Sequence, residues 1–220
     1  MTLAKITGID LSLKSLSYAK RKSKELGFEN IEFIHSDILQ LKNLNKKFDI
    51  IESIGTLHHM KTPQAGLKIL VDILKPNGFL KLGLYSKKAR DYVIKAREII
   101  KERNFNTSIE DIRKCRELIF DNEDDLIIKK LLNRGDFYST SNVRDLLFHV
   151  QEHHFTIPQI SKMLKKFNLE FLGFINSSNK NKFLKFFSQN DITSLDKWDR
   201  FENDNPSSFM GMYQFWVKKK

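Results

Sequence analysis

Short apolar runs alternate with longer amphipathic stretches in the first 85 residues of the chain. A Lys-rich amphipathic stretch over 12–26 predicts one helix, and a second stretch from Thr62 predicts another that stops at Pro76 and Gly78. Because strands that alternate with helices form right-handed crossovers, this pattern predicts an α/β fold with a mainly parallel sheet. The predicted strands, each rich in β-branched and aromatic residues, are 4–10, 31–34, 48–54 and 79–85.

The pattern changes after residue 86. Residues 86–132 are charged and amphipathic without strand signals, which predicts an inserted helical cap. The run RGDFYSTSNVRDLLFHVQEHHF mixes aromatic and polar residues in a loop or broken helix, a mixture that often lines sites. A helix is predicted from Pro158, and strands over 169–175 and 212–217 then complete the sheet. The aromatic residues between these two strands fit a buried core better than a base-stacking surface. The predicted parts are 1–86 (partial core), 87–157 (cap and substrate-lining insertion) and 158–220 (completion of the sheet).

Candidate chemistry follows the predicted strands. Ligands of an open parallel sheet bind beyond the carboxyl ends of its strands, where Asp10, Asp37, Ser53 to His59 and Tyr85 stand. A carboxylate has two acceptor oxygens and can hold both hydroxyls of a ribose, so Asp10 is either a ribose ligand or a simple turn acid. Asp37 can accept from the exocyclic amine of adenine, with the N–H of Ile38 donating to a ring nitrogen.

The order GIDLS, NIEFIHSDIL, FDIIESIGTLHHM, ILKPNGFLKLGLYS resembles the class I S-adenosylmethionine (SAM) dependent methyltransferases over residues 4–86. The resemblance implies a Rossmann-like, mostly parallel sheet with an antiparallel last strand, and SAM as the cofactor. It also implies that Asp10 binds the ribose and Leu11 packs on the adenine, while Asp37 and Ile38 read the adenine edge. Ser53, Ile54 and Gly55 would run past the methionine moiety.

The rest of the chain is similar to a narrower bacterial group of methyltransferases, often fused to tetratricopeptide repeats, through FYSTSNVRDLLFHVQEHHFTIPQI and FMGMYQFWVKK. One family element is missing. A first strand and a D-x-G-x-G loop should lie well before Asp10, yet only nine residues precede it. In the family this strand pairs with the strand of Asp10 on one side and that of Ile50 on the other. We therefore expect either a chain truncated before the loop or a product that packs around the gap.

Imidazole and phenol groups are candidates for the chemistry itself. His58 and His149 could take a proton from the methyl acceptor, because an imidazole titrates near neutral pH. In the family that the chain resembles, a His-His pair at this place commonly caps and packs the following helix instead. Tyr85 is a third candidate. The acceptor pocket is expected to include Tyr138, Arg144, His149 and His153. The run from His149 to His153 also matches the inverted zinc-protease pattern H-x-x-E-H, but Pro158 ends any helix soon afterwards, so we expect no metal site.

Composition narrows the cellular location and the partners that we expect. The single Cys115 cannot form an internal disulfide, and no long apolar segment is present, which favours a cytoplasmic protein without membrane contact. The net charge of +11 permits a polyanion partner, but scattered surface lysines explain it equally well. The leading hypothesis is methyl transfer from SAM to a small molecule or protein side chain. The alternatives are a non-catalytic module that binds no SAM, and an RNA methyltransferase; the oligomeric state is left open.

Overall fold

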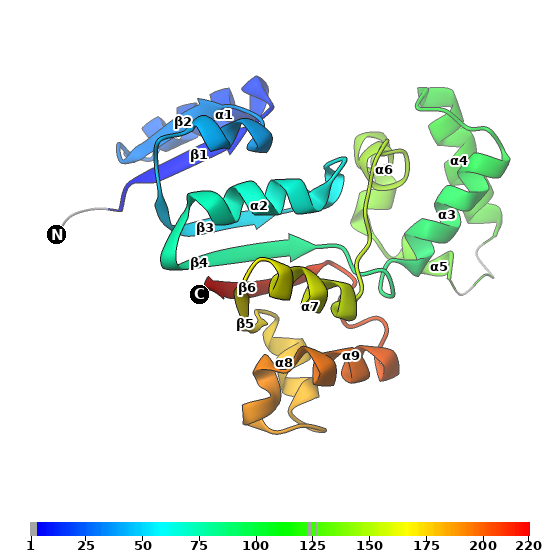
Figure 1. Ribbon diagram of the computed structural model, residues 1–220. Helices are drawn as coiled ribbons and strands as arrows, with labels where there is room; N and C mark the ends of the chain where they lie inside the picture. The colour runs from blue at the N-terminus through cyan, green and yellow to red at the C-terminus, as the bar shows by residue number, and fades with distance from the viewer. Residues whose placement is uncertain (1–3, 123–124, 126) are drawn as a thin grey trace.

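A computed structural model describes residues 4–122, 125 and 127–220, and these residues form two sheets with associated helices (Figure 1). β1 (Ile6–Asp10) and β2 (Ile31–His35) make a parallel pair. A four-stranded sheet has the order β3 (Phe48–Ile54), β4 (Leu74–Leu84), β6 (Tyr213–Lys219), β5 (Leu169–Phe174). β3 and β4 are parallel, whereas β6 is antiparallel to β4 and β5. The predicted α/β class, with an antiparallel last strand, is confirmed.

The first helix follows its sequence signals closely. α1 (Leu13–Glu25) begins after Ser12, whose hydroxyl accepts from the N–H of Ser15. It ends before Gly27, which has a φ of +75°. The whole of α1 is described and none of its residues is buried, so β1, α1 and β2 form a thin unit with little core of its own.

β1 and β3 each have one edge that no described strand occupies, because β1 pairs with β2 and β3 with β4. Ile6 on β1 is 47% exposed and Ile50 on β3 is 57% exposed. Parallel strands are normally covered on both faces, so apolar side chains this open are unusual in such a sheet. Both sheets therefore have an edge with exposed apolar side chains.

The boundary between α2 (Pro63–Ile73) and β4 differs from the predicted one. The helix ends before Pro76 is reached, because Leu74 already pairs with Phe48 as the first residue of β4. Asn77 has a φ of +60°, and a Cβ on Gly78 would lie 2.9 Å from the carbonyl oxygen of Asp49. The turn KPNG is thus part of an irregular strand start, and it needs glycine at its last position.

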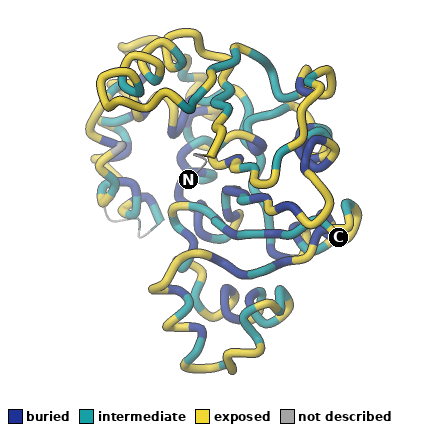
Figure 2. The backbone as a smooth tube through the Cα atoms, turned by 90° about the vertical axis from the view of Figure 1, so that its left-hand side faces the viewer, coloured by how far each residue is buried: buried dark blue, intermediate teal, exposed yellow. Residues whose placement is uncertain are grey.

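Two short 3-10 turns, η1 (Ile38–Asn43) and η2 (Leu57–His59), follow β2 and β3. α2 and α7 (Ile157–Lys166) lie on one face of the four-stranded sheet (Figure 1). Thr156 and Gln159 form a capping box at the start of α7, with Pro158 in its first turn. Figure 2 shows buried stretches in the strands in the middle of the molecule, and further buried residues lie in the cap and in the C-terminal helices.

A C-terminal group of helices packs beneath the sheet: α8 (Ser177–Phe183), η4 (Gln189–Thr193) and α9 (Leu195–Asp204). Trp198 is fully buried, stacks on Phe183 at a centroid distance of 4.0 Å and donates from Nε1 to the carbonyl of Ile192. Phe201 and Phe209 are buried as well. The prediction that these aromatic residues form a core is confirmed for Phe183, Trp198, Phe201 and Phe209, whereas Phe187 is partly buried and Phe186 is 69% exposed.

The described part of the cap consists of helices joined by turns and irregular segments, and it has its own apolar cluster, which includes Cys115 and Phe137. Burial raises the pKa of the Cys115 thiol to about 12. None of the helices in the described part of the chain is long and apolar enough to cross a membrane. The elements of the cap are α3 (Asp91–Glu102), α4 (Ile109–Asp121), α5 (Lys129–Leu132), η3 (Gly135–Tyr138) and α6 (Thr140–Leu147).

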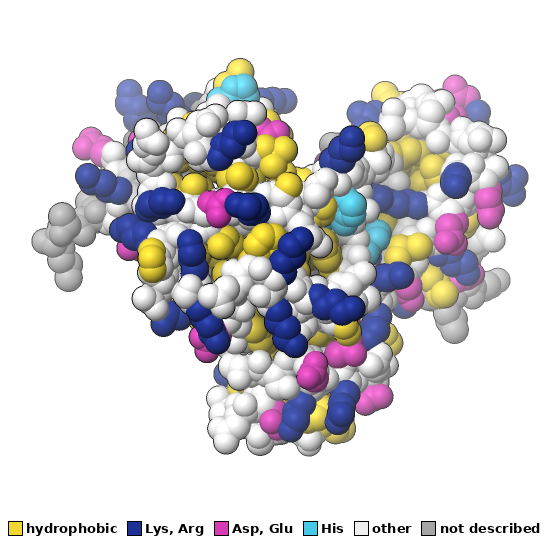
Figure 3. Space-filling model, in the orientation of Figure 1, with side chains coloured by type: hydrophobic (Ala, Val, Ile, Leu, Met, Phe, Trp, Pro, Cys, Tyr) yellow, Lys and Arg dark blue, Asp and Glu magenta, His cyan; other side chains and the backbone are white. Residues whose placement is uncertain are grey.

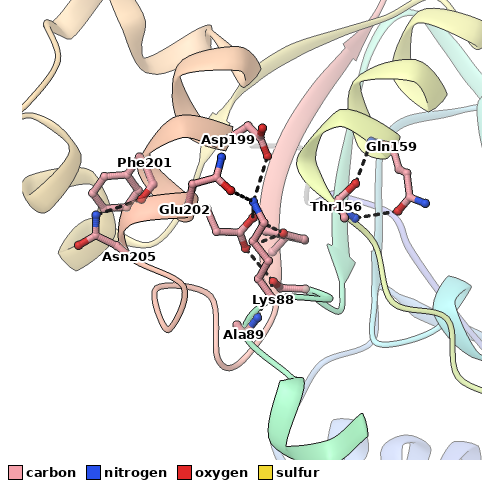
Figure 4. Close-up of polar contacts among 11 residues, drawn as sticks. Lys88, Ala89, Thr156, Gln159, Asp199, Phe201, Glu202 and Asn205 are labelled. Carbon is pink, nitrogen blue, oxygen red and sulfur yellow. Dashed lines mark hydrogen bonds and ion pairs between the residues drawn. The ribbon is translucent and has the colours of Figure 1, made fainter.

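A buried polar cluster fixes the end of β4 to α9 and β6 (Figure 4). Glu202 is fully buried and accepts hydrogen bonds from the hydroxyls of Ser86, at 2.7 Å, and Tyr213, at 2.6 Å. Lys88 lies 3.4 Å from Asp199 and 3.9 Å from Glu202. Burial raises the pKa of Glu202 in spite of these donors and the lysine. The chain that leaves β4 toward the cap is therefore anchored at its first residues.

Candidate functional site

A pocket of about 910 Å³ lies between the carboxyl ends of the strands and the helical cap. Figure 3 shows the recess between the sheet body and the cap, with histidine side chains at its base. Asp10 enters the pocket from β1, His59 from η2, Tyr85 from the end of β4, and His149 from the segment after α6. A volume in this range suits a small-molecule ligand.

The strand-end acids each use one carboxylate oxygen in a local turn. Oδ1 of Asp10 accepts from the N–H of Ser12 at 2.8 Å, and Oδ1 of Asp37 accepts from the N–H of Leu39 at 2.8 Å. Because β1 and β2 are parallel and paired, the N–H of Ser36 also donates to the Asp10 carbonyl. The two acids thus stand side by side at adjacent strand ends. The alternative that the sequence offered for Asp10 was an acid in a turn. This turn is present, and it uses one of the two carboxylate oxygens.

The remaining predicted cofactor residues surround this edge. Leu11 is 66% exposed and presents an apolar side chain directly after Asp10. Ile38 is partly buried against the main core, and Ser53 is buried at the end of β3. Gly55 has a φ of +77° with open space around its Cβ position, so the backbone conformation rather than crowding requires glycine there. Of the predicted cofactor residues, only Asp10 lines the pocket itself; no observation assigns a ligand to the others.

His58 and His59 occupy different environments although they are adjacent. His58 is fully buried, with its ring centroid 3.8 Å from that of Tyr85, and burial lowers its pKa to about 3. His59 lines the pocket, and its ring lies 4.0 Å from that of His149. Burial also lowers the pKa of His59, while a hydrogen bond to the Gln151 carbonyl opposes this effect. The catalytic function predicted for His58 remains a prediction, and its position favours packing beneath Tyr85.

Tyr85 is held by a charged cluster beneath the pocket. The guanidinium of Arg90, which is 3% exposed, lies 3.7 Å from the centroid of the Tyr85 ring. Glu152, with a side chain 1% exposed, lies 3.1 Å from Arg90 and 3.2 Å from Arg97 and accepts from His154 at 2.6 Å. Burial alone would raise the pKa of Glu152, but His154 and the two arginines outweigh it and lower the pKa to about 2. Burial likewise raises the pKa of Tyr85, so its phenol is neutral near pH 7.

The H-x-x-E-H run has no zinc-binding geometry. α6 ends at Leu147, so His149 and His153 do not share a helical face, and Glu152 is paired with arginines. Among the described residues, no group of three or more histidine, cysteine or acidic side chains is placed to hold a metal ion.

The predicted acceptor residues fall into two sets. His149 lines the pocket, whereas the hydroxyl of Tyr138 donates to the Leu132 carbonyl and Arg144 donates to the Thr107 carbonyl, both within the cap. The N–H of His153 donates to the His58 carbonyl. The face of α6 that meets the pocket was missed, although its spacing of three, four and seven residues could have indicated it. That face consists of Asn142, Asp145, Leu146 and, just beyond the helix, His149.

A family model described as "Methyltransferase domain" matches residues 1–168. The chain belongs to this methyltransferase domain family. A relative from Synechococcus sp., uncharacterized protein syc1184_c, is 27% identical over 214 residues, which cover 90% of this chain and 50% of the relative. PKMT2 from Rickettsia typhi in complex with AdoHcy has a TM-score of 0.70 at 19% identity over 97% of this chain and 44% of that chain. A second PKMT2 structure gives a TM-score of 0.64 at 18% identity over 96% and 42%.

These likenesses confirm the sequence-based assignment to methyltransferases and the Rossmann-like fold. This methyltransferase domain spans about half the length of the relatives that it matches. The relation to tetratricopeptide-fused proteins and the truncation stay predictions, as does the division at residues 86 and 157.

Proposed function

We propose that this methyltransferase domain carries the nucleoside-binding and acceptor-facing parts of a site for SAM-dependent methyl transfer to a small molecule or a protein side chain. The observation that carries the proposal is the pocket that joins Asp10 to Tyr85, His59 and His149. Asp10 and Tyr85 come from the carboxyl ends of strands and His59 from the turn after β3, where a sheet of this class binds its ligands, while His149 comes from the cap side. PKMT2, of similar fold, is described with bound AdoHcy.

The residues present fit the nucleoside half of SAM. Asp10 has a carboxylate oxygen beyond the one in its turn, and a carboxylate is the acceptor that a ribose diol requires. Leu11 adds exposed apolar surface for the adenine ring, and Asp37 stands at the neighbouring strand end. When bound, SAM supplies a methyl group on a sulfonium leaving group. The protein is left to position the acceptor, and the rings of Tyr85, His59 and His149, which neighbour one another in the pocket, are the groups available for this.

Calorimetric titration with SAM and with AdoHcy tests the proposal. Asp10→Asn is the informative variant, because the amide oxygen can still accept from the N–H of Ser12 while the second acceptor oxygen is replaced by a donor. We expect Asp10→Asn to weaken binding at least about tenfold, since a hydrogen bond to a charged group contributes about 1.5–3 kcal/mol. Asp37→Asn, which keeps its own turn by the same logic, should weaken SAM binding as well. Unchanged affinity in Asp10→Asn would refute the ribose assignment.

The edges of β1 and β3 that no described strand occupies make a second outcome informative. If residues 1–220 bind neither ligand at millimolar concentration, the titration is repeated with a designed apolar strand and a glycine-rich loop fused before residue 4. Binding restored by the fusion shows that a strand between β1 and β3 completes the site. Binding in neither form supports the non-catalytic alternative.

A further inference from the structure

We propose that His59 is the base that takes the proton of the methyl acceptor, and that the main chain of Gln151 holds it in the tautomer that can do so. This inference rests on the proposed function and adds a catalytic residue to it. It also limits the acceptor to a group that loses a proton when it is methylated, such as an amine or a hydroxyl group.

The hydrogen bond of His59 determines its tautomer. Nδ1 of His59 lies 3.1 Å from the carbonyl oxygen of Gln151. A carbonyl oxygen can only accept, so Nδ1 must carry the hydrogen and donate it. In the neutral ring Nε2 is then unprotonated and has a free lone pair, which is what a base needs. His59 lines the pocket that also contains Asp10, so this imidazole stands on the same cavity as the strand-end acid.

The same residue sets the opposite tautomer in the neighbouring imidazole. The N–H of Gln151 donates to Nδ1 of His149 at 3.3 Å, so the hydrogen of neutral His149 sits on Nε2. The two rings lie 4.0 Å apart at an angle of 30°. Nε2 of His59 is therefore an acceptor and Nε2 of His149 a donor. The backbone of Gln151 specifies both tautomers.

The Gln151 main chain is held firmly enough to impose this choice. The N–H of His153 donates to the His58 carbonyl at 2.8 Å, and the N–H of Phe155 donates to the Tyr85 carbonyl at 2.8 Å. Residues 151–155 thus run along η2 and the end of β4 as an extended strip. The strip carries the hydrogen-bonding groups of its backbone to the imidazoles, so no side chain of the strip is needed for this function.

The charges around His59 favour a neutral ring. The groups that face it are His58 from η2, Tyr85 from β4, and Arg90, His149 and Glu152 from the cap side. Burial and the nearby His149 and Arg90 disfavour an imidazolium, while the Gln151 carbonyl and Glu152 favour it; the net effect lowers the pKa of His59 below 6.5. An imidazole with this pKa is available as a base at pH 7.

Methyl transfer balances with the acceptor, SAM and His59 alone. The nucleophilic nitrogen or oxygen of the acceptor forms a bond to the methyl carbon, and the carbon–sulfur bond breaks with its electron pair on sulfur. The proton of the acceptor goes to Nε2 of His59, which becomes an imidazolium and releases the proton to solvent. The other product is neutral AdoHcy, and the next turnover starts from the same His59 tautomer.

Tautomers can be measured directly, without an acceptor or SAM. Two-bond proton–nitrogen NMR spectra of the chain labelled with ¹⁵N-histidine at pH 7.5 show which ring nitrogen carries hydrogen. We expect hydrogen on Nδ1 of His59, hydrogen on Nε2 of His149, and a midpoint for His59 below that of a free imidazole. Loss of signals in His59→Asn, or in His59→Gln if the first variant does not fold, assigns His59. Hydrogen on Nε2 of His59, or a charged ring at pH 7.5, would overturn the inference.

Gln151→Ala is the matched control, because it removes the side chain and keeps both main-chain groups. Its spectra should show the tautomers of the wild type. A change of the His59 tautomer in this variant would show that the side chain, and not the backbone, is responsible, which contradicts the proposal.

The pH dependence of methyl transfer tests the catalytic function. Tritiated SAM is incubated with poly-L-lysine and with the small-molecule filtrate of a bacterial extract, and incorporation is followed from pH 5 to 9. His59→Asn keeps a donor near the Nδ1 position but removes Nε2, so we expect a loss of about 100-fold or more and a change in the acidic limb of the profile. An unchanged profile overturns the proposal. No incorporation by the wild type counts against the proposed function instead, and the tautomer measurement still decides whether His59 can be a base.

Discussion

Removal of the charge of Glu152 is the sharpest test of how this pocket is built. Glu152→Gln keeps the size of the side chain and leaves Arg90 and Arg97 without their common anion. The pKa of Glu152 falls from an ordinary 4.5 to about 2 in the folded protein. At about 1.4 kcal/mol per pKa unit, this difference corresponds to roughly 3 kcal/mol of stabilisation by the ionised carboxylate. Removing one partner from a buried ion pair costs about 3–5 kcal/mol, which agrees.

The sign of the pH dependence follows from the lowered pKa. The unfolded chain takes up the proton near pH 4.5 and the folded chain only near pH 2, so the contribution of Glu152 is complete above pH 4.5 and is lost as the pH falls toward 2. The free energy of unfolding of Glu152→Gln, measured with urea at pH 7.5, should be about 3 kcal/mol below that of the wild type. The gap should narrow as the pH falls below 4.5.

A matched control separates this effect from the loss of any carboxylate. Glu110 in α4 pairs with Lys114, but its side chain is 76% exposed, so Glu110→Gln should change the free energy of unfolding by less than about 1 kcal/mol. The reasoning is refuted if Glu152→Gln lies within 1 kcal/mol of the wild type at pH 7.5. It is also refuted if the gap between the two proteins is the same at pH 4 and pH 7.5.

Three further changes probe the fold around the site. Trp198→Ala should lower the free energy of unfolding in urea by about 3–5 kcal/mol, because it opens a cavity and frees the Ile192 carbonyl; a loss below 1 kcal/mol would contradict the packing. Thr156→Ala removes the capping box with Gln159 and should cost about 1 kcal/mol by thermal unfolding, and no loss would show that the cap is unimportant. Glu202 has a raised pKa, so the stability of the wild type relative to Glu202→Gln should fall as the pH rises above 4.5, and a rise would refute the burial argument.

Local signals in the sequence were enough for most of the elements. The run FDIIESI forms β3 over the predicted residues, because an apolar run between polar segments has few other ways to pair its backbone. Ser12 caps its helix as its position predicted, and Pro158 lies in the first turn of α7, where a helix start was predicted. The start of β4 could not be read in the same way, since Leu74 joins the strand through its pairing with Phe48, a contact between residues far apart in the sequence.

The site was less accessible to sequence reasoning, for the same physical reason. The sequence pointed to the strand ends and to His149, and the structure brings Asp10, Tyr85 and His149 into one pocket. It offered no means to choose between His58 and His59, because a 3-10 turn of three residues has no periodicity from which to derive a buried face. The partnership of Arg90 with Glu152 spans 62 positions, and no local pattern links them.

The strip over 151–155 explains why the cap and the sheet form one site. Ser86, two residues beyond the end of β4, forms a parallel bridge with Phe155. The strip therefore runs beside the segment that leaves β4. Glu152 on this strip ties Arg90 beneath Tyr85, while the backbone of Gln151 orients His59 and His149 above it. The side chain of Glu152 serves the first task and the main chain of Gln151 the second, so a change of the Gln151 side chain leaves both in place.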